Sequence, residues 1–195
     1  MSVFCPLNRL FCSMSQHVFS RRQFLALTGG TLVTASMFPT TVLASYPDKP
    51  RTLAMNNLHT GESLEACYFD GVNYVSDEMA RINQICRDFR RNEVHPMDRA
   101  LFDQISQIQS LLGTQTEVQI ISGYRSPATN EALRSKSSGV AKKSYHMLGK
   151  ALDFRLDGVK LSHVREAAIS LKAGGVGYYA KSDFVHIDTG PARQW

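Results

Sequence analysis

Two histidines and an aspartate in the last third of the chain have the side-chain types of a metal site. His146 and Asp153 are seven residues apart, and His186 follows in the segment Asp183-Phe184-Val185-His186-Ile187-Asp188. Imidazole and carboxylate bind borderline divalent metals such as zinc, and three protein ligands leave a fourth position for water, as catalytic zinc requires. Taken singly, each residue has an ordinary alternative. His146 could be a surface or core histidine, and Asp153 lies in an apolar stretch where an inward carboxylate needs a partner.

The chain must turn between His146 and Asp153 if both side chains are to bind one ion. Seven residues span about 23 Å in a strand or about 10 Å in a helix, whereas ligand atoms around one zinc ion lie about 3.5 Å apart. The intervening Leu148-Gly149-Lys150 contains a glycine, the residue that turns without steric cost. The spacing therefore predicts a turn at Gly149.

The elements that must position these residues form one α+β unit without repeats. Strand patterns cover residues 52–58, 63–69, 118–122, 150–156, 176–180 and 184–188. Helical patterns cover 76–91, 98–112, a short stretch after Ser126-Pro127, and 162–172, while 136–144 is a polar loop. Because helices and strands do not alternate regularly, we expect an antiparallel-rich central sheet backed by helices in a single catalytic domain, residues 45–195.

Residues 1–44 have the parts of an export signal. Ser20-Arg21-Arg22-Gln23-Phe24-Leu25 is followed by an apolar stretch of about 15 residues and by Val42-Leu43-Ala44 before Ser45. The paired arginines resemble the twin-arginine signal, which predicts delivery to the periplasm. An uncleaved membrane anchor is the alternative, but a spanning helix needs about 20 residues, so we expect no stable membrane insertion. Met14 shortly precedes the arginines, so Met1 to Ser13 could be an upstream extension from a misassigned start.

The charge of the chain gives no support for nucleic acid as a partner. The chain has 22 basic and 17 acidic residues, and three of the basic residues but none of the acidic ones lie in residues 1–44. The remaining 19 basic and 17 acidic residues leave a net charge of +2 on residues 45–195. This charge is too small to indicate nucleic-acid binding.

Two cysteines, Cys67 and Cys86, remain after residues 1–44 are set aside. They could pair in an oxidising compartment. Alternatively, Cys67 in a strand and Cys86 on the apolar face of a helix pack as small reduced side chains. The sequence does not supply the Cα separation that decides between these readings.

Three motifs together resemble the zinc peptidases of the D-Ala-D-Ala carboxypeptidase and hedgehog-like fold, and within them the murein endopeptidase K type. They are S-G-Y-R at 122–125, H-x-x-G-x-A-x-D at 146–153 and H-x-D at 186–188. The resemblance implies Zn²⁺ bound by His146, Asp153 and His186. It also implies that Arg125 orients a carboxylate or carbonyl of the substrate, the peptide stems of peptidoglycan. We expect a monomer that hydrolyses peptide cross-links, most specifically the bond between two diaminopimelate residues.

The general base is open between two carboxylates. Relatives place an acidic residue three positions before the late histidine, which is Asp183 here, often as the longer Glu. Alternatively, Asp183 is a turn residue in Lys181-Ser182-Asp183, although we favour the role of base. Asp188 lies on the same face of a strand as His186 and is the second candidate for the base, although orienting His186 is the role we favour for it.

Three other functions fit part of the pattern. A carboxypeptidase that removes terminal D-Ala would use the same metal chemistry in a cleft of different depth. A non-catalytic murein-binding module would need the cleft but not the base. A structural zinc site would need a fourth protein ligand, and no cysteine lies near the motif to supply it.

Overall fold

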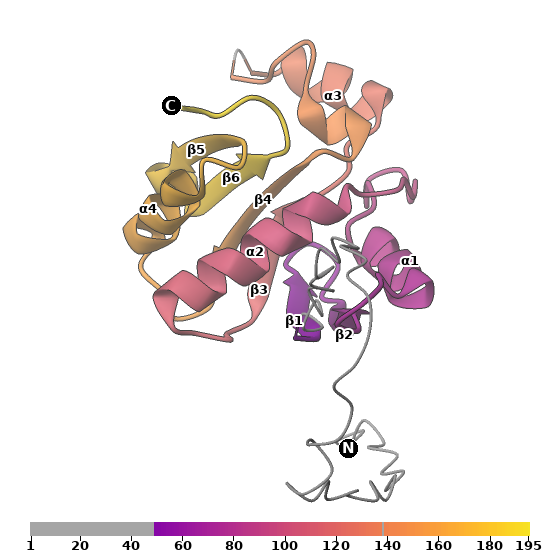
Figure 1. Ribbon diagram of the computed structural model, residues 1–195. Helices are drawn as coiled ribbons and strands as arrows, with labels where there is room; N and C mark the ends of the chain where they lie inside the picture. The colour runs from indigo at the N-terminus through magenta and orange to yellow at the C-terminus, as the bar shows by residue number, and fades with distance from the viewer. Residues whose placement is uncertain (1–48, 138) are drawn as a thin grey trace, which may run out of the picture. The chain divides into compact units, whose positions relative to one another are not determined.

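The computed structural model describes residues 49–137 and 139–195, so the expected signal segment lies outside the described residues. Strands and helices follow one another as drawn in Figure 1. They are β1 (Arg51–Asn57), β2 (Ser63–Phe69), α1 (Ser76–Ile85), α2 (Arg99–Leu112), β3 (Val118–Ser122), α3 (Pro127–Arg134), the 3-10 turn η1 (Tyr145–Leu148), β4 (Ala151–Leu156), α4 (Leu161–Leu171), β5 (Gly175–Tyr179), the 3-10 turn η2 (Ala180–Ser182), β6 (Phe184–Asp188) and β7 (Arg193–Gln194). None of these helices combines the length and the apolar character that crossing a membrane requires.

All seven strands belong to one mixed sheet with the order β2-β1-β3-β4-β6-β5-β7. The pairs β1–β2, β3–β4, β4–β6 and β5–β6 are antiparallel, whereas β1–β3 and β5–β7 are parallel. The α+β class is confirmed, but the expected antiparallel-rich sheet is in fact mixed. The connection from β1 to β3 contains β2, α1 and α2, and a crossover of this length lets the chain return in the same direction.

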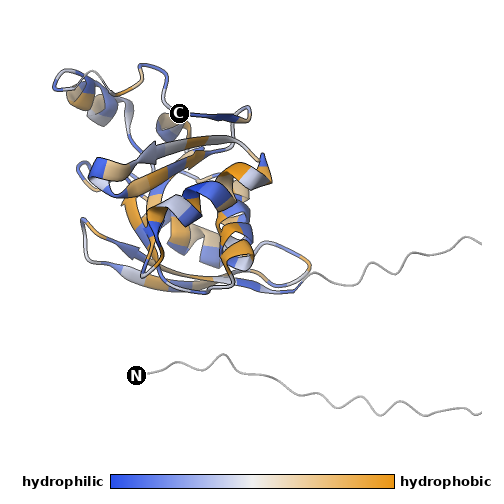
Figure 2. Ribbon diagram, turned by 90° about the vertical axis from the view of Figure 1, so that its left-hand side faces the viewer, coloured by the Kyte–Doolittle hydropathy of each residue, from blue (hydrophilic) through white to orange (hydrophobic). Residues whose placement is uncertain are grey.

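Helices α2 and α4 pack against each other and against the sheet, and they are in the foreground of Figure 1. Both carry apolar and polar residues, which appear as mixed colours in Figure 2. The apolar residues of α2 at 101, 105 and 108 are fully buried in one core with Leu152, Phe154 and Leu156 of β4. The helices expected at the back of the sheet are therefore confirmed, because an amphipathic helix buries its apolar face against another element.

Strand β4 presents a different chemistry on each face. Side chains alternate along a strand, so Leu152 and Phe154 point into the helix-covered core and Asp153 and Arg155 point to the opposite face. Nearly every residue of β4 is buried, yet only one of its faces is apolar. The face of the sheet away from α2 and α4 is therefore the face that can hold polar chemistry.

Helix α1 is shorter than the periodicity of 76–91 predicts. It ends at Ile85, and Val75, with no side-chain hydrogen bond, occupies the capping position before Ser76. The chain then turns back through a bridge between Asp88 and Glu93. The buried carboxylate of Asp88 accepts hydrogen bonds from the backbone nitrogens of residues 90 and 126, and these bonds favour the turn over a longer helix.

The predicted ends of α2 and the predicted start of α3 are confirmed. Asp98 caps α2 by accepting a hydrogen bond from the backbone nitrogen of Ala100, and Gly113 ends this helix in the left-handed region at φ 64°. Ser126 caps α3, with Pro127 in its first turn. Helix α4 differs slightly, since Lys172 at φ 52° ends it before the glycines at 174 and 175.

Cys67 and Cys86 are both free thiols in the structure, so the disulfide that the sequence allowed is absent. The alternative of reduced packing holds for Cys86, which is fully buried in the core. Burial raises the pKa of the Cys86 thiol to about 12, so this side chain is an inert apolar group at neutral pH.

Candidate metal centre

His146 reaches the polar face of the sheet from the turn η1. The backbone nitrogen of His146 donates to Ser144 Oγ, which opens the turn, and Gly149 ends it at φ 65°. A Cβ atom at position 149 would lie 2.2 Å from the carbonyl oxygen of Pro96, so only glycine fits this close approach. The predicted turn at Gly149 is confirmed, and it brings the chain directly into β4.

The ring of His146 has one nitrogen available for a ligand. Its Nδ1 lies 2.8 Å from the carbonyl oxygen of Gly123, which can only accept a hydrogen bond, so Nδ1 carries the proton. The other nitrogen, Nε2, faces Asp153 Oδ2 at 3.3 Å. Nε2 is therefore the nitrogen of His146 that can bind a ligand, and it points at the carboxylate.

Asp153 and His186 lie opposite each other on the antiparallel strands β4 and β6. His186 Nδ1 is 2.8 Å from Asp153 Oδ1. His146, Asp153 and His186 are all buried, and one ligand atom from each lies within 4.8 Å of the others. No other such group of histidine, cysteine and acidic side chains occurs in the described part of the chain. The three residues chosen from the sequence are therefore brought together, at separations suited to one four-coordinate ion.

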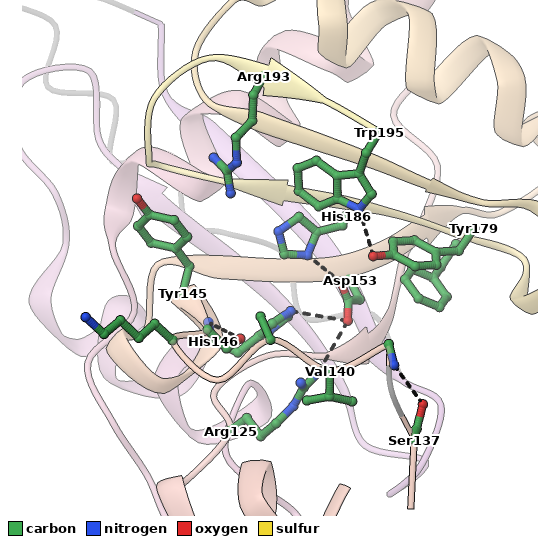
Figure 3. Close-up of a pocket in the computed structure, with 15 residues that line it drawn as sticks. Arg125, Ser137, Val140, Tyr145, His146, Asp153, Tyr179, His186, Arg193 and Trp195 are labelled. Carbon is green, nitrogen blue, oxygen red and sulfur yellow. Dashed lines mark hydrogen bonds and ion pairs between the residues drawn. The ribbon is translucent and has the colours of Figure 1, made fainter. Parts of the chain in front are cut away.

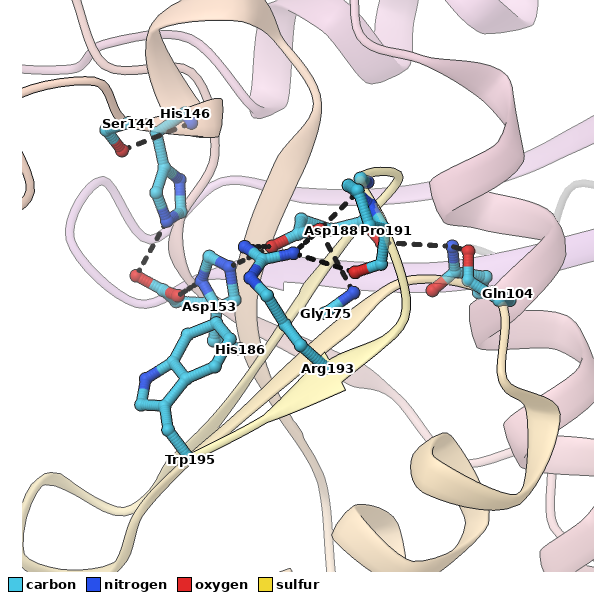
Figure 4. Close-up of polar contacts among 12 residues, drawn as sticks. Gln104, Ser144, His146, Asp153, Gly175, His186, Asp188, Pro191, Arg193 and Trp195 are labelled. Carbon is cyan, nitrogen blue, oxygen red and sulfur yellow. Dashed lines mark hydrogen bonds and ion pairs between the residues drawn. The ribbon is translucent and has the colours of Figure 1, made fainter.

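The second nitrogen of His186 has its own partner. Nε2 lies 3.1 Å from Asp188 Oδ2, and Asp188 is fully buried behind the ring, as Figure 4 shows. Asp188 also accepts hydrogen bonds from the backbone nitrogens of Gly175 and Gly190 and from the guanidinium of Arg193. This arrangement fixes the ring of His186 with Nδ1 toward Asp153, which is the orienting role expected of Asp188.

Opposite charges compensate the burial of these carboxylates. Burial alone would raise the pKa of Asp153, but His146 and His186 hold the pKa of this carboxyl well below its usual range. Burial would likewise raise the pKa of Asp188, but its bonds with His186, Arg193 and two backbone nitrogens lower it. Both groups are therefore carboxylates at neutral pH, ready to accept from an imidazolium or to bind a cation.

His186 has the opposite balance. Burial would lower the pKa of His186, but its hydrogen bonds to Asp153 and Asp188 outweigh burial and raise the pKa to about 9. Without a metal, the ring is therefore doubly protonated at neutral pH and donates to both carboxylates. A metal ion that takes Nδ1 must displace this proton.

Asp183 is not brought to the metal centre. It follows η2 at φ 54°, forms an ion pair with Arg155 of β4, and its side chain is 61% exposed. It lines a neighbouring cavity with Arg155 and Gln119, separate from the cavity that contains the three candidate ligands. In this structure Asp183 thus lies at the turn before β6, with Arg155 as its ionic partner.

Arg125 does lie at the centre, on the loop after β3. One of its terminal nitrogens is 3.7 Å from Asp153 Oδ2 and 3.3 Å from Ser122 Oγ, while the buried Nε has no partner. Burial lowers the pKa of Arg125, and the nearby Asp153 opposes this shift. A buried guanidinium with long and incomplete bonds retains hydrogen-bonding capacity for an anionic ligand.

The loop that carries Arg125 is held by residues that the sequence analysis did not select. The backbone nitrogen of Tyr124 donates to the carbonyl oxygen of Cys86 at 2.7 Å, and a Cβ atom at Gly123 would lie 2.3 Å from that oxygen. Asp88 accepts from the hydroxyl and the backbone nitrogen of Ser126. The early end of α1 therefore determines where Arg125 lies.

A cavity of about 360 Å³ surrounds the three candidate ligands and Arg125. Figure 3 shows aromatic side chains on one side of Asp153 and Arg125 on the other. The additional side chains at the cavity include Tyr145, for which the sequence allowed either lining the cleft or simply packing, and Tyr179, Arg193 and Trp195, which the sequence did not indicate. The signal available for Trp195 was that it is the single tryptophan of the chain, a few residues after the H-x-D motif.

A His–Asp–His set in an open cavity on the polar face of an α+β sheet is the arrangement of a catalytic metal site. A family model described as Peptidoglycan L,D-endopeptidase MepK matches residues 45–195, so the chain belongs to this family. The resemblance to murein endopeptidases of the K type is therefore confirmed.

Two relatives illustrate the extent of the similarity. The chain is 54% identical over 177 residues to Peptidoglycan L,D-endopeptidase MepK of Escherichia coli strain K12, covering 90% of this chain and 97% of that protein. It is 45% identical over 179 residues to the Probable peptidoglycan L,D-endopeptidase MepK of Haemophilus influenzae, covering 90% of this chain and 95% of that protein. The similarity thus extends over nearly the whole length of both relatives.

We predict that metal binding at this centre weakens as the pH falls. Because the pKa of His186 is about 9 in the metal-free protein, Nδ1 must lose a proton to bind. The apparent affinity for Zn²⁺, used as the probe, should therefore fall about tenfold per unit of pH below about 9 and level off above it.

Competition against a chelator of known pH dependence, at several values between about pH 7 and 9, measures this slope. His163→Ala is the matched control, because His163 is an exposed histidine of α4 and the variant should keep the slope. An affinity that does not change with pH would contradict the assignment of His186 as a ligand.

Proposed function

We propose that the protein is a zinc-dependent endopeptidase that hydrolyses peptide cross-links of peptidoglycan, most specifically the bond between two diaminopimelate residues. The observation that carries this proposal is the buried set of His146, Asp153 and His186 in a cavity with Arg125. The family, described as peptidoglycan L,D-endopeptidases, supports the substrate and the reaction. No feature of the described residues favours a carboxypeptidase or a non-catalytic module. Digestion of purified sacculi distinguishes both from an endopeptidase.

The donor set fits zinc. Two imidazole nitrogens and one carboxylate oxygen are typical zinc ligands, and three protein donors leave room for a fourth ligand in the cavity. His146 Nε2, His186 Nδ1 and an oxygen of Asp153 would hold the ion. When bound, zinc supplies a Lewis acid that polarises the scissile carbonyl and lowers the pKa of water.

The side chains of the chain itself supply orientation and proton transfer. Gly123 and Asp188 keep the two histidine rings in the tautomers that direct a nitrogen to Asp153. Arg125 would hold a substrate carboxylate beside the bond that is cut, because it lines the cavity and its terminal nitrogens make only long contacts of 3.3 Å, 3.5 Å and 3.7 Å. These groups are fixed before substrate arrives, which lowers the cost of reaching the transition state.

We keep Asp183 as the proposed general base. Asp188 is enclosed by His186, Arg193 and two backbone nitrogens, so it has no access to the open side of the cavity. Asp183 is exposed at the start of β6, and its partner Arg155 is two residues along β4 from Asp153 on the same face. The proposed step requires Asp183 to leave Arg155, accept a proton from the attacking water and pass it to the leaving amine.

Digestion of purified sacculi followed by separation of the muropeptides tests the function. The wild-type protein with zinc should remove dimers cross-linked through two diaminopimelate residues, and His186→Ala should not. His163→Ala is the matched control and should be fully active. Loss of terminal D-Ala alone would favour the carboxypeptidase. Binding to sacculi without release of any product would favour the non-catalytic module. Loss of only those dimers that are linked in another way would show that the enzyme cuts a different cross-link.

We predict that Asp183→Asn retains zinc and substrate binding but loses about 10²- to 10⁴-fold in kcat, the contribution of a positioned acid–base group. Steady-state kinetics on a purified cross-linked muropeptide, with zinc content measured in parallel, gives this result. Asp157→Asn is the matched control, because Asp157 lines the same neighbouring cavity and bonds to Gln119. If the two variants have equal kcat, Asp183 is not the base.

We also propose that residues 1–44 direct export to the periplasm by the twin-arginine route. Changing both Arg21 and Arg22 to Lys should leave the precursor in the cytoplasm, because the arginine pair distinguishes this segment from a general secretory signal. Fractionation and immunoblotting measure the distribution, and Arg9→Lys is the control for an arginine outside the pair. Normal periplasmic delivery of the double variant would show that another signal is read.

A further inference from the structure

Trp195 lies beside the candidate metal ligands without belonging to them. Its ring centroid is 5.3 Å from that of His186, with the two planes tilted by 50°. The side chain lines the cavity around the metal centre, and the residue remains 49% exposed. Figure 3 shows the indole across His186, with Arg125 on the far side of Asp153.

The indole is held rigidly despite its exposure. Its Nε1 donates to the hydroxyl of Tyr179 at 2.9 Å. The backbone on either side of the ring is paired with β5, since the nitrogen of Trp195 donates to Val176 and its carbonyl oxygen accepts from Tyr178. A side chain that is already fixed loses little conformational entropy when a ligand packs on it.

The position below the ring is a glycine. Gly177 is the neighbour of His186 in the register of β5 and β6, and a Cβ atom there would lie 2.8 Å from Cε2 of Trp195. The indole therefore rests directly on the backbone of β5. Any larger residue at 177 would displace the indole, so the absence of a side chain at Gly177 is what lets the ring pack on the strand.

The cavity thus has two unlike sides. Trp195 supplies an aromatic face, with the guanidinium carbon of Arg193 5.0 Å from the ring centroid, and Tyr179 and Phe184 stack on each other at 4.6 Å on the same side. Arg125 supplies a cation on the other side, with a buried nitrogen that lacks a partner. A ligand that contacts both sides needs an aliphatic part against Trp195 and a carboxylate at Arg125, with the metal centre between them.

We propose that Trp195 is a substrate-binding residue whose exposed indole face packs on the aliphatic side chain of the peptide residue held at Arg125. This inference rests on the proposed function and specifies how the substrate is recognised. Diaminopimelate fits, because it has a chain of methylene groups between two charged ends. Apolar contact with the methylene groups contributes affinity, while the carboxylate at Arg125 sets the orientation.

Kinetics on a cross-linked muropeptide separate this role from a structural one. Trp195→Ala should raise KM about tenfold with kcat changed less than about threefold, since contact in the bound state is lost and the reacting groups remain. Trp195→Phe should have a KM close to that of the wild type, because it keeps an aromatic face at this position. The control Gln194→Ala, at the adjacent exposed residue of β7, should match the wild type.

The alternative is that Trp195 only supports His186. In that case Trp195→Ala would lose zinc and kcat while KM stayed the same, and the proposal would be overturned. An unchanged KM with unchanged kcat would overturn it too. Zinc content and melting temperature of each variant accompany the kinetics. If the wild-type protein itself cleaves no cross-link, the proposed function fails, and that failure is visible without any variant.

Fluorescence gives a readout that does not depend on turnover. Trp195 is the only tryptophan of the chain, so the intrinsic emission reports this one position. Adding the uncross-linked disaccharide tetrapeptide, which lacks the bond to be cut, to the zinc-loaded protein should shift or quench the emission with saturation. Gly177→Ala, which displaces the ring, should weaken this binding. Gln194→Ala, at an exposed residue that does not line this cavity, should not. Saturable binding without any change in emission would overturn the proposal.

Discussion

The pairing of Asp153 with His186 across β4 and β6 is the constraint on which the rest of the site depends. Directly opposed residues of an antiparallel pair point to the same face, so this register alone brings a carboxylate and an imidazole into contact. A slip of β6 by one residue would turn His186 toward the core that contains Leu152 and Phe154, on the face opposite to Asp153. The apolar face of β4, packed under α2 and α4, therefore specifies the position of the polar ligands.

The remaining parts of the site compensate for charge that this register buries. Asp153 lies between two histidines and near Arg125, and Asp188 between His186 and Arg193. An unpaired carboxylate in either place would be costly to bury. The same bonds that neutralise the charge also fix the rings, so the stability of the buried network and the orientation of the ligands have one physical origin.

Sequence reasoning predicted what depends on local chemistry. The turn at Gly149, the cap at Ser126 and the candidate ligand set were predicted from short motifs and from the family resemblance that they carry. The parallel pairing of β1 with β3 was missed, because strand direction depends on a long crossover that has no local pattern. The early end of α1 was missed as well, because the partner of Asp88 is the distant Ser126. Trp195 belongs to no periodic sequence pattern, and its packing on Gly177 arises only when the sheet has formed.

The separation of the ligands along the chain has a consequence for the lifetime of the protein. His146 and Asp153 are close in sequence, but His186 comes from another strand and meets them only when the sheet has formed. An unfolded chain therefore does not present the three candidate ligands together, and a metal ion that uses all three would bind the native state more tightly. By mass action, the ratio of native to unfolded molecules then rises with the free metal concentration. Scarcity of the metal ion would then lower the amount of the protein as well as its activity, because unfolded molecules are exposed to proteolysis.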